Sequence, residues 1–209
     1  MVAVTGLLLV GFVVAHMLGN LQIFMGQEQL NWYAHKLQSA PLLLWPARFF
    51  LVLIVAAHIF FSTQLAVENK KARPVAYAVK DTVQASLASR TMVVSGILLT
   101  LFIIYHLLHF TFGLAHPEIF HLVDAKGRHD VYSISILSFQ NWIISGAYVV
   151  AMFFLCFHLS HGLASFPQSL GLSNEKCQPC LKWMAKAVSA IIFIGNSSIP
   201  LSVLLGFVE

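Results

Sequence analysis

The chain has 209 residues, of which 58% are hydrophobic and 10% are charged, and its mean hydropathy is +0.80. This composition excludes a disordered chain, which needs low hydropathy and many charges. Three cysteines exclude a small disulfide-built domain, and a net charge of +4 is too small for a nucleic-acid surface. A membrane protein is therefore expected. Its unusual feature is ten histidines, because ionisable side chains in hydrocarbon need partners.

Five stretches are apolar and long enough to cross a bilayer, which takes about 20 helical residues. They are residues 2–24, 42–67, 91–114, 143–166 and 184–208. The sequence thus predicts an all-α integral membrane bundle of five helices, forming one domain over residues 1–209. Every Asp and Glu falls outside the stretches. We detect no internal repeat with a shared motif.

The basic residues are divided unevenly between the two sides of the predicted bundle. One side carries Lys70, Lys71, Arg73, Lys80, Arg90, Lys176, Lys182 and Lys186. The other side carries Lys36, Arg48, Lys126 and Arg128. Because cytoplasmic loops hold the excess of Lys and Arg, the N-terminus is predicted to be cytoplasmic and the C-terminus to be outside.

Six histidines lie within the stretches, and four of them sort into pairs by depth. At 1.5 Å per residue, His16 lies ~21 Å and His106 ~22 Å from the inner start of its helix. The second and fourth stretches run in the opposite direction, which puts His58 and His158 ~6–8 Å from the inner edge of a ~30 Å slab. An outer pair and an inner pair, each from two helices, are therefore expected.

Two further histidines compete with these four. His109 and His161 each follow a paired histidine by three residues and share its helix face. Depth favours His106, because His109 would lie at ~27 Å. Depth does not decide between His158 and His161.

Two metal centres explain such pairs better than four separately satisfied core histidines. Zinc or copper would need more ligands, whereas the stretches offer no carboxylate and only Cys156 as a thiol. A haem needs only two axial ligands from the protein. With both supplied by histidines, the iron has no open coordination position and is suited to electron transfer. Two haems are therefore predicted. Gly19, Ser62 and Gly162, beside the histidines, are compatible with a bulky insert and equally with ordinary helix packing.

The segments around five histidines resemble a known family. They are VTGLLLVGFVVAHMLGNLQIF at His16, NWYAHKLQS at His35, VLIVAAHIFFSTQLA at His58, SGILLTLFIIYHLLHFTFG at His106 and FHLSHGLASFPQSLGL at His158. Together they resemble the diheme cytochrome b anchor subunit of succinate:quinone oxidoreductases, the single-polypeptide five-helix type of succinate dehydrogenases and fumarate reductases. The resemblance covers four of the five helices in the family's order.

The resemblance implies the haem ligands. In the family the third-helix ligand lies ten residues after a Ser/Thr-Gly pair, which fits Gly96 and His106. The fourth-helix ligand precedes a Gly-Leu by four residues, which fits His158 and Gly162 and not His161. The implied pairs are first with third helix and second with fourth, as the depths also indicate.

The resemblance also implies partners and a location, the bacterial cytoplasmic membrane. A flavoprotein subunit and an iron–sulfur subunit would dock on the cytoplasmic side, where the basic loop from Glu68 to Arg90 would receive them or serve topology alone. Electrons would pass between the iron–sulfur clusters, the two haems and a quinone, usually menaquinone, in either direction between succinate and fumarate. Some family members carry a proton-transferring glutamate two residues before the fourth-helix ligand. Here that residue is Cys156, which argues against such proton transfer.

Polar residues of the first outer loop suggest a quinone site. Quinone reduction consumes protons, so a donor is needed near an interface. Glu28, Asn31, His35 and Gln38 cluster close to the outer haem position. The hypothesis is a menaquinone site with His35 or Glu28 as proton relay, against simple solvation of the loop.

Arg48, near the outer end of the second helix, is a candidate partner for a haem propionate or a snorkelling side chain. The pair Cys177 and Cys180 is too weak a motif for a metal site. Two other functions compete: the cytochrome b subunit of a membrane hydrogenase or formate dehydrogenase, and a transporter that uses histidines. One histidine on each of four successive helices favours the succinate family.

Overall fold

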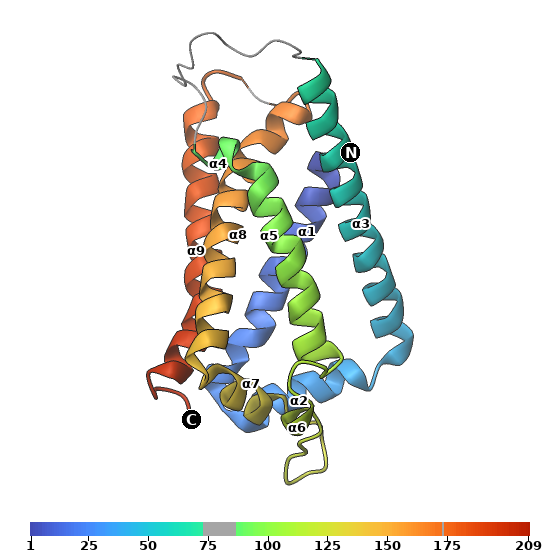
Figure 1. The fold of residues 1–209 in the computed structure, drawn as a ribbon, viewed down its shortest axis with the longest axis vertical. Coiled ribbons are helices and arrows are strands. Elements are labelled where there is room, and N and C mark those ends of the chain that lie inside the picture. The colour runs from blue at the N-terminus through green and yellow to red at the C-terminus, as the bar shows by residue number, and fades with distance from the viewer. Residues whose placement is uncertain (73–86, 173) are drawn as a thin grey trace.

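The computed structural model describes residues 1–72, 87–172 and 174–209, and within these ranges every regular element is a helix (Figure 1). Five helical segments are long and apolar enough to cross a membrane. They are α1 (Val2–Asn20) with the 3-10 helix Leu21–Met25, α3 (Pro41–Lys71), α5 (Met92–His106) with the π-helix Leu107–Thr111, α8 (Trp142–Ser169) and α9 (Gln178–Leu204). The prediction of an all-helical, multi-pass membrane protein is confirmed.

Several helices extend beyond the predicted apolar stretches. Helix α3 continues to Lys71, and α9 begins at Gln178 instead of residue 184, with a proline in its first turn. Proline is tolerated there because the first backbone N–H groups of a helix have no partner within the helix. Hydropathy predicts only the segment that crosses the hydrocarbon. The helix itself extends beyond this segment into the polar interface, because its backbone hydrogen bonds continue there.

Two short helices at one end of the bundle were not predicted. They are α2 (Gln27–Gln38) and α7 (Val131–Phe139), which lie near the C-terminus, with the single turn α6 (Pro117–Phe120) close by (Figure 1). Gly26 turns the chain into α2 at φ 92°, a conformation that favours glycine. Helix α7 is capped by Asp130, whose carboxylate accepts a hydrogen bond from the Ser133 N–H at 3.1 Å.

Four of the long helices form the bundle that carries the histidines. Helix α1 packs against α3 and α8, and α5 packs against α8, while α9 covers α8 and part of α1 (Figure 1). Helices α1 and α5 therefore face each other across one diagonal, and α3 and α8 across the other. A buried apolar cluster closes the end near the C-terminus. It consists of Ile23, Leu30, Ile136, Phe139, Ile144, Tyr148, Ile199 and Val203.

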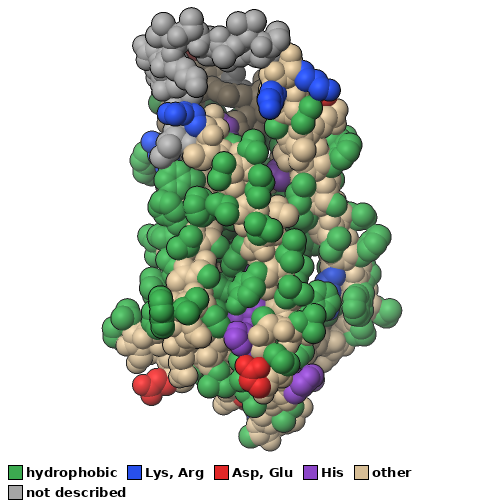
Figure 2. All heavy atoms as spheres, in the orientation of Figure 1, with side chains coloured by type: hydrophobic (Ala, Val, Ile, Leu, Met, Phe, Trp, Pro, Cys, Tyr) green, Lys and Arg blue, Asp and Glu red, His purple; other side chains and the backbone are tan. Residues whose placement is uncertain are grey.

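On the face that Figure 2 shows, the surface is mostly apolar over the middle of the molecule, with most charged side chains toward its two ends. Helix α3 buries none of its residues against the protein, as expected for a helix exposed to lipid. Lys70, Lys71 and Arg90 lie at the end where α3 finishes and α4 (Leu87–Arg90) begins. Arg73 and Lys80, from the predicted docking loop, lie outside the described residues.

Candidate cofactor site: two histidine pairs

The structure brings together two pairs of histidines from four helices. His16 on α1 approaches His106 on α5, with ring centroids 5.7 Å apart. His58 on α3 approaches His158 on α8, with ring centroids 6.4 Å apart. Each pair crosses one diagonal of the bundle, so the rings meet between helices that do not pack directly on each other. The pairs are those that the depth count indicated.

The distances suit two imidazoles on opposite sides of one metal ion. Imidazole–metal bonds of ~2.0–2.1 Å would put the ring centroids ~6 Å apart, close to both observed values. Among the described residues, no group of three or more His, Cys, Asp or Glu side chains is placed to hold a metal ion. This donor set fits a haem, whose porphyrin supplies the other four nitrogens, better than a zinc site built from protein ligands alone.

Hydroxyl groups hold the ring of each residue in the His58–His158 pair. Thr5 Oγ1 lies 3.0 Å from His58 Nδ1, and Ser95 Oγ lies 3.1 Å from His158 Nδ1. Each hydroxyl also donates to a backbone carbonyl of its own helix, Thr5 to Val2 at 3.1 Å and Ser95 to Met92 at 3.0 Å. A hydroxyl has one proton to donate, so a hydroxyl that donates to the carbonyl accepts from the Nδ1–H of the histidine. Each Nε2 then carries the lone pair that a metal needs.

The His16–His106 pair has different neighbours. The Asn20 amide nitrogen lies 3.1 Å from His16 Nε2, and the Tyr148 hydroxyl lies 3.3 Å from His106 Nδ1. His106 thus has Nε2 available for a metal. His16 presents the same nitrogen to Asn20, so metal binding by His16 through Nε2 requires the amide to move aside.

His109 has a different environment from His106, although both lie on one face of the helix. Its side chain is 2% exposed. Its Nδ1 lies 3.0 Å from the Tyr148 hydroxyl, and its Nε2 lies 2.9 Å from Ser138 Oγ. With both ring nitrogens bonded, His109 is a satisfied core histidine. It sits in the π-helix Leu107–Thr111, a distortion often found at functional sites.

The glycines beside the paired histidines are Gly6 and Gly96, and not Gly19 and Gly162, which the sequence suggested as space for a bulky insert. A Cβ at Gly6 would lie 3.3 Å from His58 Cε1, and one at Gly96 would lie 3.8 Å from His158 Cε1. Gly19 instead makes room for Tyr33 on α2, whose hydroxyl would lie 2.7 Å from a Cβ there. A Cβ at Gly162 would meet nothing within 4 Å.

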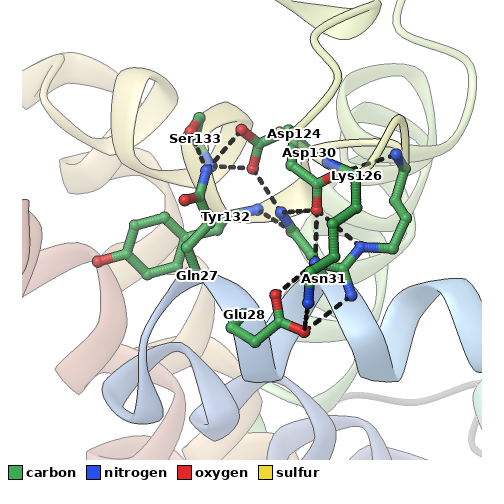
Figure 3. Close-up of polar contacts among 9 residues, drawn as sticks. Gln27, Glu28, Asn31, Asp124, Lys126, Asp130, Tyr132 and Ser133 are labelled. Atoms are coloured by element: carbon green, nitrogen blue, oxygen red, sulfur yellow. Dashed lines mark hydrogen bonds and ion pairs between the residues drawn. The ribbon is translucent and has the colours of Figure 1, made fainter.

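The residues proposed for a quinone site are on α2, at the end of the bundle near the C-terminus (Figure 1). Two of them, Glu28 and Asn31, belong to a network of charged and polar side chains (Figure 3). Glu28 pairs with Lys126 at 2.7 Å and with Arg128 at 2.8 Å. Arg128 also binds Asp124 at 2.6 Å. These contacts join α2 to the loop before α7, about 100 positions later in the chain. Glu28 is therefore engaged in fastening two segments together.

Asn31 is the buried centre of this network. It is fully buried, and its amide nitrogen donates to Asp130 at 2.8 Å, while its amide oxygen accepts from the Tyr132 N–H at 3.0 Å. Gln27 adds a hydrogen bond to Asp130 at 2.9 Å. We call Gln27, Glu28, Asn31, Asp124, Lys126, Arg128 and Asp130 the end clamp.

The carboxylates of the end clamp are held in the charged form. Hydrogen bonds from Arg128 and then Lys126 lower the pKa of Glu28. The hydrogen bond from Arg128 also holds the pKa of Asp124 well below its usual range. Burial raises the pKa of Asp130, but the hydrogen bonds from Asn31, Ser133 and Gln27 outweigh it and the net shift is downward. A carboxylate with a lowered pKa is a poor proton donor near neutral pH.

The remaining candidate residues are exposed, except for His161. His35 contacts the Ser39 hydroxyl through Nε2 at 3.3 Å, and Gln38 lies one turn of α2 further on. The Arg48 guanidinium lies over the Trp45 ring, 5.3 Å from its centroid. His161 is half-buried on α8, whereas His158 faces His58.

Sequence reasoning missed Thr5, Ser95 and Tyr148 as contacts of the paired histidines. One signal was available for the first two: Thr5-Gly6 precedes His16 by the same spacing as Ser95-Gly96 precedes His106. Helices α1 and α5 thus share a motif that we did not detect as a repeat. Tyr148 has no such signal, because its contacts depend on how α8 packs against α5.

Comparisons with models of known protein families, with curated proteins and with solved structures found no match to this chain.

Proposed function

We propose that this chain is the diheme cytochrome b membrane anchor of a succinate:quinone oxidoreductase, a succinate dehydrogenase or fumarate reductase. The observation that carries the proposal is the pair of cross-bundle histidine contacts, His16 with His106 and His58 with His158, one residue from each of four helices. These four residues are the proposed axial ligands of two b haems. When bound, the haems supply one-electron transfer between an iron–sulfur subunit and a quinone.

The chain's own residues would prepare these sites before any cofactor enters. Thr5 and Ser95 would favour the tautomers of His58 and His158 in which Nε2 is unprotonated. Tyr148 contacts Nδ1 of His106. Apolar helix surfaces around the pairs exclude water, and the bundle core is a usual place for cofactors held between facing helices.

The proposal gives the two ends of the bundle different partners. The end with Lys70, Lys71 and Arg90 would be cytoplasmic and would receive the iron–sulfur and flavoprotein subunits. Menaquinone would bind at the opposite end, near the His16–His106 pair. His35 and Gln38 remain candidates there because their side chains are exposed, with His35 as the proton relay. The proposed role of Glu28 changes to fastening α2, since its carboxylate is already paired with two cations.

The test is a reduced-minus-oxidised spectrum of the purified protein, together with haem quantitation per chain. The proposal expects an α-band of bis-histidine b haem and two haems per chain. A chain that carries no haem would instead favour the histidine-using transporter.

Co-purification identifies the electron donor. A co-purified flavoprotein with covalent or tightly bound flavin and succinate–quinone activity supports the proposal. A co-purified hydrogenase or formate dehydrogenase subunit would instead indicate that the chain is the cytochrome b subunit of that enzyme. In membranes of His35→Ala, loss of quinone turnover at unchanged haem content would support the quinone site. Lys36→Ala, one residue away on the exposed surface of α2, is the matched control.

A further inference from the structure

The two Ser/Thr-Gly pairs occupy equivalent positions in the bundle. Thr5 is the fourth residue of α1, and Ser95 is the fourth residue of α5. Each lies eleven residues before the histidine of its own helix, His16 and His106. At 1.5 Å per residue, that separates hydroxyl and histidine by ~16 Å along the helix axis. Neither hydroxyl therefore reaches the histidine on its own helix.

Each hydroxyl instead contacts a histidine on the neighbouring helix. Thr5 reaches His58 on α3, and Ser95 reaches His158 on α8. Both residues are buried, Thr5 at 7% and Ser95 at 1% exposed. When the hydroxyl donates its proton to the backbone carbonyl, it accepts from the Nδ1–H of the imidazole. The contact thus sets both the tautomer and the orientation of the ring.

The glycine after each hydroxyl lies beside the same ring, and at Gly6 the ring uses space that a side chain would take. A side chain at Gly6 would come within 3.3 Å of His58 Cε1, closer than ordinary van der Waals contact, so the ring would have to shift. At Gly96 the corresponding distance is 3.8 Å, which is ordinary contact. Gly11, on the same helix as Gly6, would meet nothing within 4 Å.

From these contacts we infer that Thr5-Gly6 and Ser95-Gly96 hold the rings of His58 and His158, the histidines of the other two helices; we call these two residue pairs seats. Helices α1 and α5 thus position the His58–His158 centre, and they also supply the ligands of the His16–His106 centre. The hydroxyl accepts a hydrogen bond from Nδ1–H, and Gly6 leaves room for the ring of His58. Thr5 and Ser95 are positioning residues. This inference rests on the proposed function, because it assigns their role toward a metal bound at His58 and His158.

A hydrogen bond at Nδ1 has a defined effect on the opposite nitrogen. It raises the basicity of the ligand, which stabilises the more oxidised metal and lowers the midpoint potential. Removing one seat hydroxyl should raise the potential of the His58–His158 haem and leave the other haem unchanged. The effect therefore appears at the haem that is not bound by the substituted helix.

The experiment is a redox titration of the purified full-length protein, with the low-spin ferric EPR signals of both haems recorded alongside. The two signals are first assigned with His58→Ala and His16→Ala, each of which removes one haem. Thr5→Val and Ser95→Ala are then compared with Thr100→Val, whose hydroxyl donates only to the Gly96 carbonyl at 2.8 Å. Thr5→Ser keeps the hydroxyl and should restore the wild-type potential.

The glycines provide a second, independent measurement. Gly6→Ala should change the EPR signal of the His58–His158 haem or lower its occupancy, while Gly11→Ala should leave both signals as in the wild type. If Thr5→Val does not accumulate in the membrane, Ser95→Ala removes the equivalent hydrogen bond on α5 and decides the question together with Gly6→Ala.

The outcomes separate the two claims. A shift confined to the His58–His158 haem supports the seats. Unchanged potentials in both hydroxyl variants, or a shift of the His16–His106 haem in their place, overturns the seats and leaves the proposed function standing. A wild-type protein that binds no haem overturns both.

Discussion

His16 and His106 approach each other from opposite corners of the bundle, with ring centroids 5.7 Å apart and ring planes inclined by 85°. They lie 90 positions apart in the sequence. The nearby His109, one turn beyond His106, is bonded through both ring nitrogens to Tyr148 and Ser138. Two histidines on one helix face thus have different surroundings, and the proposed difference in their roles can be measured.

The first prediction concerns His106 and His109. If the proposed function holds, His106→Ala should lower the haem content from two to one per chain, because the proposed axial ligand is lost. His109→Gln should retain both haems, since its nitrogens already have protein partners. Haem is measured as the pyridine haemochrome against protein concentration. Equal loss in the two variants would contradict the assignment.

The second prediction compares the two histidines of α8. His158 faces His58 with ring centroids 6.4 Å apart, whereas His161 is half-buried and belongs to neither pair. His158→Ala should remove the haem that His58→Ala removes, with the same remaining EPR signal. His161→Ala is the matched control and should keep two haems. Retention of both haems in His158→Ala would exclude that residue as a ligand.

The third prediction concerns Asn31 in the end clamp. Asn31→Ala removes its hydrogen bonds to Asp130 and to the Tyr132 N–H and leaves buried polar groups without partners. The expected loss in the free energy of unfolding is about 1–3 kcal/mol. Denaturant titration in detergent, followed by circular dichroism, measures it. Lys36→Ala, exposed on the same helix, should change stability by less than the Asn31 variant, and an equal loss would count against the clamp.

The fourth prediction concerns the pH dependence of the end clamp. The pKa values of Glu28, Asp124 and Asp130 are lowered in the folded chain. The stability that they contribute is fully present above the ordinary carboxyl pKa of about 4 and is lost as the pH falls through the lowered values.

Amide exchange in α2 and α7 tests this pH dependence. After correction for the intrinsic exchange rate, protection should stay constant between about pH 7 and 5 and fall only below about pH 4. Loss of protection near pH 6, where histidines titrate, would show that the carboxylates do not determine how the stability of the end clamp depends on pH. The core of α8 serves as an internal reference.

The sequence by itself determined the class of the protein and the position of its four paired histidines. Long apolar stretches without carboxylates specify membrane helices because backbone groups in lipid must be bonded within the helix. A constant rise per residue then converts sequence position into depth, and depth alone is enough to pair His16 with His106. The same arithmetic cannot place side chains around the helix axis, so it does not decide between His158 and His161.

Tertiary structure decided the contacts that depend on which helices are neighbours. Thr5 and His58, or Asn31 and Asp130, are far apart in the sequence, and only the packing of α1 on α3 and of α2 on α7 brings them together. The short helices α2 and α7 were missed for the same reason. A short segment of 12 or nine residues is marginal as a helix by itself and is stabilised by the surface it covers.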